Sequence, residues 1–158
     1  TLRVVTCALP GREPVRVAAC YRMPTGSGVA DNFAAGGLAA PLGEDGRLGC
    51  AVRKDIRSGS CTSHPDTGAA ISGAELPFWR EMVELAKRAH RCVGDVAFVG
   101  WDVACIQSGP ILVEANPYWC GELVQISHDQ PLGEMTFPHL LRDALEAVSR
   151  RDGAVRPQ

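Results

Sequence analysis

The most informative stretch of the sequence is residues 100–117, which read GWDVACIQSGPILVEANP. Two apolar runs flank a short polar segment that ends in glycine, a pattern typical of a β-hairpin. If residues 107–109 form a three-residue loop, Ile106 pairs with Pro110. This register then fixes which side chains of the two strands share a face.

In this register Asp102 lies opposite Glu114, and Asn116 follows two residues later on the same face. Two like charges that face each other destabilise a sheet by up to about 1 kcal/mol unless something neutralises them. A divalent cation would do so, and carboxylate and amide oxygens are ligands that suit Mg²⁺. The alternative is an ordinary amphipathic hairpin whose acids face solvent, with Val103 and Ile111 on its buried face.

The whole chain predicts an α+β fold. Apolar runs bounded by turn residues predict four further strands, Leu2–Cys7, Val15–Met23, Leu38–Leu42 and Leu48–Ile56. Apolar residues at helical spacing predict two helices, Pro77–His90 and Phe137–Ser149. Residues 25–37 and 59–73 are predicted to be loops, and residues 150–158 are predicted to fray. This order indicates a mainly antiparallel sheet with two packed helices.

Size and charge exclude several classes of protein. A chain of 158 residues with 46% hydrophobic content can bury a core, and it most simply forms one compact unit. The net charge of −2 gives no general attraction to nucleic acid. No run of 18 apolar residues is present, so no membrane span is expected.

The seven cysteines are odd in number, and none has the close spacing of a zinc or redox site. They are interpreted as small, buried, free thiols in a reducing compartment, so the chain is expected to be cytoplasmic. Cys120, in the segment after the hairpin, is the thiol that could lie near a substrate.

The sequence resembles the ATP-grasp superfamily, and in particular its sugar-transfer-associated family. The resemblance extends from Thr1 to about Gln125. It rests on the order and spacing of five short segments: Thr1–Thr6, Asp31–Gly37, His64–Gly68, Gly100–Asp102 and Gly109–Pro117.

The resemblance implies an ATP-grasp C-terminal lobe, in which Asp102, Glu114 and Asn116 hold two Mg²⁺ ions on the ATP phosphates. Residues 1–158 would then be the C-terminal portion of an ATP-grasp domain. The lobe that clamps the nucleotide would precede Thr1. The chain would be a fragment of a longer protein or a degenerate relative, and the isolated chain would be inactive.

Two further sets of residues are candidates through the same resemblance. Asn32, Gly36 and Gly37 would lie beside the triphosphate, although any glycine-rich surface turn has a similar composition. Arg3 would be a catalytic cation that touches the transferring phosphate or acyl group, although a solvent-facing arginine is the simpler interpretation of its place in a strand. His64 is a weaker candidate for contact with a substrate.

The implied reaction is an ADP-forming ligation. ATP would activate a small-molecule carboxylate as an acyl phosphate. An amine or other nucleophile would then attack the acyl phosphate, and a sugar-linked molecule is one candidate for this acceptor. The family name associates this chemistry with polysaccharide biosynthesis. Two alternatives remain: a catalytically inactive ATP-grasp-like scaffold or binding module, and a metal-dependent hydrolase that uses the same acids.

Overall fold

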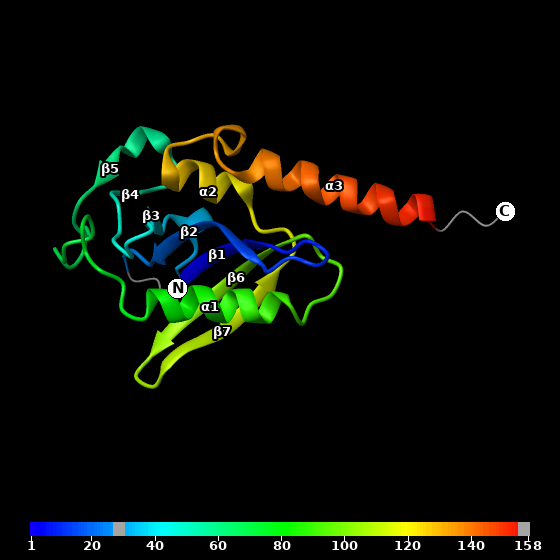
Figure 1. Cartoon of the computed structure of the whole chain (residues 1–158). Coiled ribbons are helices and arrows are strands. Elements are labelled where there is room, and N and C mark those ends of the chain that lie inside the picture. Colours follow the sequence, from blue (N-terminus) through cyan, green and yellow to red (C-terminus); the bar gives the residue numbers. More distant parts are fainter. Residues whose placement is uncertain (27–30, 155–158) are drawn as a thin grey trace.

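The computed structural model describes residues 1–26 and 31–154 (Figure 1). Its core is one antiparallel sheet of seven strands in the order β5-β4-β3-β2-β1-β6-β7. The strands are β1 (Leu2–Cys7), β2 (Val15–Met23), β3 (Leu38–Pro41), β4 (Ala51–Val52), β5 (Ser60–Cys61), β6 (Phe98–Ile106) and β7 (Gly109–Asn116). The helices are α1 (Trp79–His90), α2 (Gly121–His128) and α3 (Phe137–Ala154), with short 3₁₀ turns η1 (Phe33–Ala35), η2 (Ile56–Ser58) and η3 (Leu132–Glu134). The predicted α+β class with an antiparallel sheet is confirmed.

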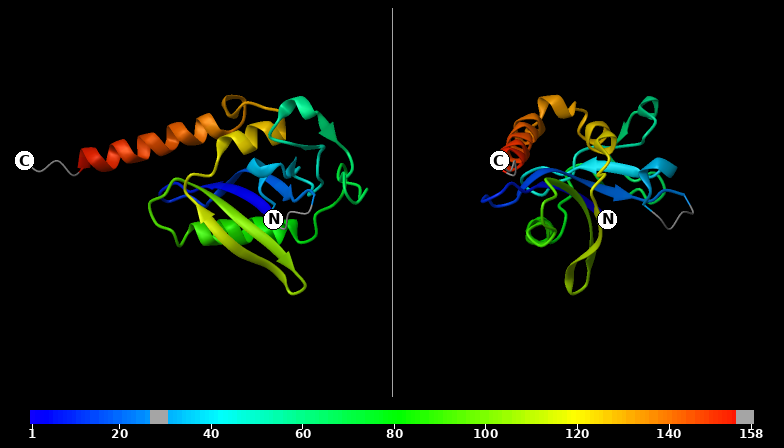
Figure 2. Two further views of the ribbon diagram at one scale, coloured as in Figure 1. Left: turned by 180° about the vertical axis from the view of Figure 1, so that it is seen from behind. Right: turned by 90° about the vertical axis from the view of Figure 1, so that its right-hand side faces the viewer.

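Helices cover both faces of the sheet. Figure 1 and the end-on view in Figure 2 place α1 on one face and α2 with α3 on the other. Met82 of α1 packs into the main core with Val4 of β1, whereas Val124 of α2 packs with Val5. Because successive residues of β1 point to opposite faces, Arg3 shares its face with Val5 and therefore lies on the α2 side.

Several predicted boundaries are correct and others are wrong. The ranges of β1 and β2 match the prediction, but Leu48–Ile56 contributes only the two-residue strand β4. The predicted loop 59–73 contains β5. Such short strands are defined by their partners, because two residues cannot show the alternation of a strand in the sequence.

The prediction of two helices is also wrong, because α2 is a third. With eight residues, α2 is too short for an apolar stripe to stand out from loop sequence. Helix α3 continues to Ala154 through residues expected to fray, and the Glu146–Arg150 pair at 3.0 Å supports its last turns. Residues 155–158, and residues 27–30 of the predicted loop 25–37, lie outside the described residues.

The cysteines are only partly as expected. All seven are free thiols, but only Cys7 and Cys20 are buried, and burial raises the pKa of each to about 11. Four others are exposed, namely Cys50, Cys92, Cys105 and Cys120. The wide spacing of the cysteines along the sequence therefore did not predict which of them are buried. In the part of the chain that the structure describes, no helix is both long and apolar enough to span a membrane.

A buried hydrogen-bond network joins α1 to the sheet. The hydroxyl of Thr6 accepts a bond from Trp101 Nε1 at 2.8 Å and lies 2.6 Å from His90 Nδ1. His90 Nε2 lies 2.7 Å from the carbonyl of Val96, so Nε2 carries the proton and Nδ1 accepts from Thr6. Burial lowers the pKa of His90 below its ordinary value, which keeps the ring neutral at pH 7.

Replacing Thr6 by Val is expected to lower the free energy of unfolding by about 2–6 kcal/mol, because two buried polar groups lose their partner at about 1–3 kcal/mol each. Thr6→Ser keeps the hydroxyl and removes one methyl group, for a loss of about 1 kcal/mol. Urea denaturation followed by circular dichroism measures both. Equal losses in the two variants would show that the hydroxyl does not stabilise the fold.

Candidate functional site

The β6–β7 hairpin places the three predicted metal ligands on one face. Asp102 pairs with Glu114, and Asn116 pairs with Gly100. These pairs are those expected from the sequence, and their side chains share a face because they are separated by two residues along each strand.

The predicted loop of the hairpin is nevertheless wrong. Ile106 pairs with Gly109 rather than with Pro110. The register then shifts between Asp102 and Val103, where β7 has one additional residue, Val113. The bulge restores the register that a three-residue loop would have produced.

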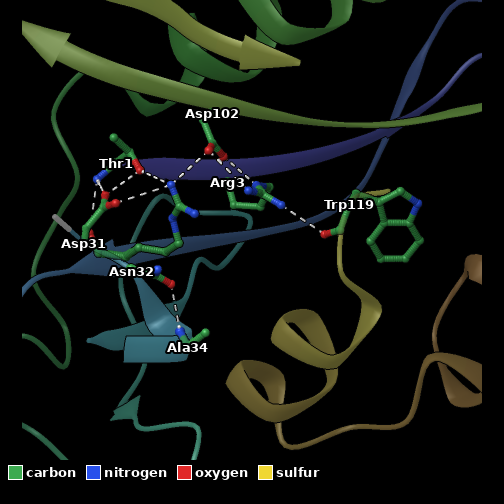
Figure 3. Close-up of polar contacts among 8 residues, drawn as sticks. Thr1, Arg3, Asp31, Asn32, Ala34, Asp102 and Trp119 are labelled. Atoms are coloured by element: carbon green, nitrogen blue, oxygen red, sulfur yellow. Dashed lines mark hydrogen bonds and ion pairs between the residues drawn. The ribbon is translucent and has the colours of Figure 1, made fainter. Parts of the chain in front are cut away.

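Asp102 is buried between two arginines (Figure 3). Arg3 Nε donates to Oδ1 of Asp102 at 2.5 Å, and Arg3 Nη2 donates to Oδ2 at 3.2 Å. Arg22, on the neighbouring strand β2, donates to the same Oδ2 at 2.9 Å. The remaining Arg3 nitrogen, Nη1, donates to the carbonyl of Trp119 at 3.0 Å. Arg3 is therefore an interior cation and not a solvent-facing one.

Arg22 extends the contacts to a second carboxylate. Its Nη2 lies 3.4 Å from Asp31 and donates to the hydroxyl of Thr1 at 2.7 Å. Asp31 Oδ2 also accepts a hydrogen bond from the hydroxyl of Thr1 at 2.5 Å. Arg3, Arg22, Asp31 and Asp102 form a charge-balanced group, here termed the arginine–aspartate cluster.

The cluster neutralises the charge of Asp102 without a metal ion. The sequence suggested that Asp102 and Glu114 repel each other until a cation binds, but two guanidinium groups already neutralise Asp102. Arg22 and Asp31 had no predicted role. A divalent cation at Asp102 would therefore share its carboxylate with arginine or displace one of the two.

Glu114 and Asn116 have unused capacity to bind a ligand. Glu114 is exposed and, within the described residues, forms no hydrogen bond or ion pair. Asn116 Nδ2 is buried without a partner, and a half-turn of the amide would put its oxygen at that position. Across residues 1–26 and 31–154, no three His, Cys, Asp or Glu side chains converge on a metal position. Asp102 and Glu114 therefore provide three oxygen-bearing ligands for Mg²⁺ only together with the amide of Asn116.

The loop after β7 folds back over the hairpin. A Cβ added at Gly100 would lie 2.5 Å from Trp119 Cβ and 3.2 Å from Arg3 Cδ, so only glycine fits there. The Trp119 ring packs edge-on against Phe137 of α3, with 5.6 Å between ring centroids. This packing holds Trp119 in place, and with it the backbone carbonyl that accepts a hydrogen bond from Arg3.

Asn32, Gly36 and Gly37 form a turn around η1. Asn32 lies next to the cluster but is not part of it (Figure 3). Asn32 Oδ1 accepts from the amide of Ala34 at 3.0 Å, and so caps η1. Gly36 has a φ of 99°, and a Cβ at Gly37 would lie 3.0 Å from two carbonyl oxygens. Backbone geometry therefore accounts for this glycine pair without a ligand.

His64 connects two loops. Its Nε2 lies 2.9 Å from the carbonyl of Pro24, and Asp66 Oδ2 accepts from the amide of Gly26 at 2.7 Å. These contacts give the predicted substrate residue a structural role at the end of β2.

Comparison with known families decides the broad class of this site. The model of the sugar-transfer associated ATP-grasp family matches residues 1–136. The chain belongs to this ATP-grasp family. A search of curated proteins and a search of solved structures returned no match.

Membership gives the chain a ligase-like role of the ATP-grasp type, and ATP with Mg²⁺ are the ligands typical of that family. The matched residues of this ATP-grasp chain include the hairpin, the cluster and the Asn32 turn, whereas α3 lies beyond them. The positions assigned to metal and nucleotide remain predictions.

Proposed function

We propose that the chain activates a carboxylate with Mg²⁺-bound ATP, forms an acyl phosphate and ADP, and transfers the acyl group to an amine or other nucleophile. One observation carries the proposal: a single face of the hairpin presents Asp102, Glu114 and Asn116 directly beside Arg3 and Arg22. Phosphoryl transfer depends on positioning and charge neutralisation, and this face offers oxygen ligands and fixed cations together.

Each group has a distinct role in the proposal. Glu114 and Asn116 bind metal, Asp102 links metal and arginine, and Arg3 with Arg22 orients the anionic oxygens of the phosphate and carboxylate. Bound Mg²⁺, two ions in the family arrangement, supplies charge neutralisation at the outer phosphates. Asn32, Gly36 and Gly37 lie at the edge of this site, beside the triphosphate of the bound ATP.

We also propose that these residues are the C-terminal portion of an ATP-grasp domain, with a nucleotide-clamping lobe earlier in the full-length protein. The chain has two lysines, Lys54 and Lys87, and each is paired with a glutamate, at 3.0 Å and 2.7 Å. Phosphate-binding lysines would then come from the other lobe. Residues 1–158 alone are expected to bind ATP weakly, because a ligand held on one side loses much of its buried surface.

The acceptor is proposed to be sugar-linked, in polysaccharide biosynthesis in the cytoplasm. The description of the family supports the link to sugar transfer. The carboxylate donor is a small molecule.

The full-length protein, given ATP, Mg²⁺, its acid and hydroxylamine, is expected to form a hydroxamate and ADP in equal amounts. Hydroxylamine intercepts an acyl phosphate, and cations concentrated at the outer phosphates favour cleavage at the γ-phosphoryl group. Chromatography of the nucleotides and the ferric assay for hydroxamate measure the products. AMP and pyrophosphate as products would contradict the proposal.

A catalytically inactive scaffold is the second candidate, because Arg3 and Arg22 occupy both oxygens of Asp102. In that case the cluster only stabilises the fold. A panel of small carboxylic acids distinguishes the two candidates: ADP release that depends on an acid supports the ligase, and no nucleotide turnover with any acid supports the scaffold.

A further inference from the structure

A concave surface lies beneath α3, away from the arginine–aspartate cluster. It forms a half-open cavity of about 500 Å³, and small-molecule sites typically span about 300–1,000 Å³. Three segments wall it: the turn between β1 and β2 (residues 8–14), the end of α1 with its following loop (residues 90–97), and the second half of α3. In both views of Figure 2 this turn lies beneath α3. Because α3 falls outside residues 1–136, the family match does not account for the cavity.

Ion pairs join the three walls in a closed ring. Each pair of neighbouring walls is connected by one arginine and one carboxylate, in the pairs Arg12–Asp143, Arg151–Asp95 and Arg91–Glu13. The first two pairs have N–O distances of 2.8 Å. Exposed pairs of this kind contribute only about 0–1 kcal/mol each, so a ligand anion can replace one carboxylate with little loss of stability.

The interior of the cavity is apolar. Side chains from all three walls line it, including Leu9, Ala97, Ala144, Ala147 and Val148. His90 also lines it as a neutral ring, since Thr6 and the carbonyl of Val96 occupy both of its nitrogens. The cavity therefore combines an apolar interior with a rim that carries three guanidinium groups.

We propose that this cavity binds an amphipathic anion, an aliphatic chain with a single carboxylate or phosphate head. The chain displaces water from the alanine-rich interior, which is favourable in proportion to the apolar area buried. The head binds Arg91, whose side chain is 46% exposed, the lowest value among the three rim arginines. Glu13, its present partner, is 74% exposed and can move into solvent.

Calorimetry with octanoate, octyl phosphate and 1-octanol tests the proposal on the 158-residue chain. Both anions are expected to bind, and the tighter one identifies the head group. Octanol is expected to bind about ten-fold more weakly or worse, because it lacks the charge-assisted bond to arginine. Octanol binding as tight as that of both anions, or no binding of either anion, would overturn the proposal.

Two variants and one control locate the binding. Ala147→Phe fills the cavity from the half-buried side of α3 and is expected to abolish octanoate binding, with circular dichroism verifying the fold. Arg91→Gln keeps the cavity and is expected to weaken octanoate binding about five- to ten-fold. Arg88→Gln, in the last turn of α1 three residues before Arg91 and outside the lining residues, is expected to change nothing. Octanoate binding that survives both Ala147→Phe and Arg91→Gln would place the ligand elsewhere.

Discussion

Replacing Asp102 by Asn is expected to lower the free energy of unfolding by about 3 kcal/mol, because removal of one partner from a buried ion pair leaves an uncompensated charge. The side chains of Arg3 and Arg22 are only 8% and 15% exposed, so water cannot solvate both guanidinium groups fully. Arg22 retains Asp31, which places the loss at the lower end of the range for such pairs. Urea denaturation measures the loss.

The control for Asp102→Asn is Glu84→Gln, which removes an exposed i,i+3 partner of Lys87 on α1. Its expected loss is at most about 0.5 kcal/mol. The expectation from sequence was the opposite, because relief of the repulsion between Asp102 and Glu114 would leave the fold intact or slightly more stable without metal. Equal stability of the two variants would show that the buried arginines do not depend on Asp102.

Replacing Glu114 by Gln is expected to lower Mg²⁺-dependent nucleotide turnover of the full-length protein by about 100-fold or more, since a lost metal ligand removes several kcal/mol of charge stabilisation. The stability of the fold should stay within about 0.5 kcal/mol, because Glu114 is exposed and has no partner among the described residues. Initial rates of ADP release at saturating ATP measure the effect.

A matched variant is Glu81→Gln, which neutralises an acid of α1 on the opposite face of the sheet. It is expected to retain full turnover. Raising the Mg²⁺ concentration should partly restore Glu114→Gln and leave Glu81→Gln unchanged. Undiminished turnover in Glu114→Gln would remove Glu114 from the site, whatever the effect of Asp102→Asn on stability.

The hairpin was predictable from sequence because its signals are local. Alternation within β6 and β7 indicated which side chains share a face without knowledge of the rest of the fold. The pairing of Asp102 with Glu114 was predicted from a three-residue loop that the structure does not have, and it holds because the bulge at Val113 compensates for the shorter loop. The bulge at Val113 was not predictable, since Ile and Val fit either register equally well.

The cluster depends on contacts between strands that are distant in sequence, and for that reason it was missed. Arg3 lies 99 residues from Asp102, and Arg22 lies 80 residues from it. One signal was present: if β1 and β2 form a hairpin in the observed register, Arg3 pairs with Cys20 and shares a face with Arg22. The position of β6 beside β1, which adds Asp102, is a property of the whole sheet.

Paramagnetic broadening by Mn²⁺ tests most directly whether the hairpin face is the metal site. Mn²⁺ replaces Mg²⁺, and even weak binding with ATP broadens the NMR signals of nuclei near the ion in the ¹⁵N-labelled chain. The account predicts selective broadening of the backbone amides of Gly100 and Glu114 and of the side-chain amide of Asn116, reversed by a chelator and reduced in Glu114→Gln. Sharp signals at these three residues, with broadening centred on acids elsewhere in the chain, would contradict it.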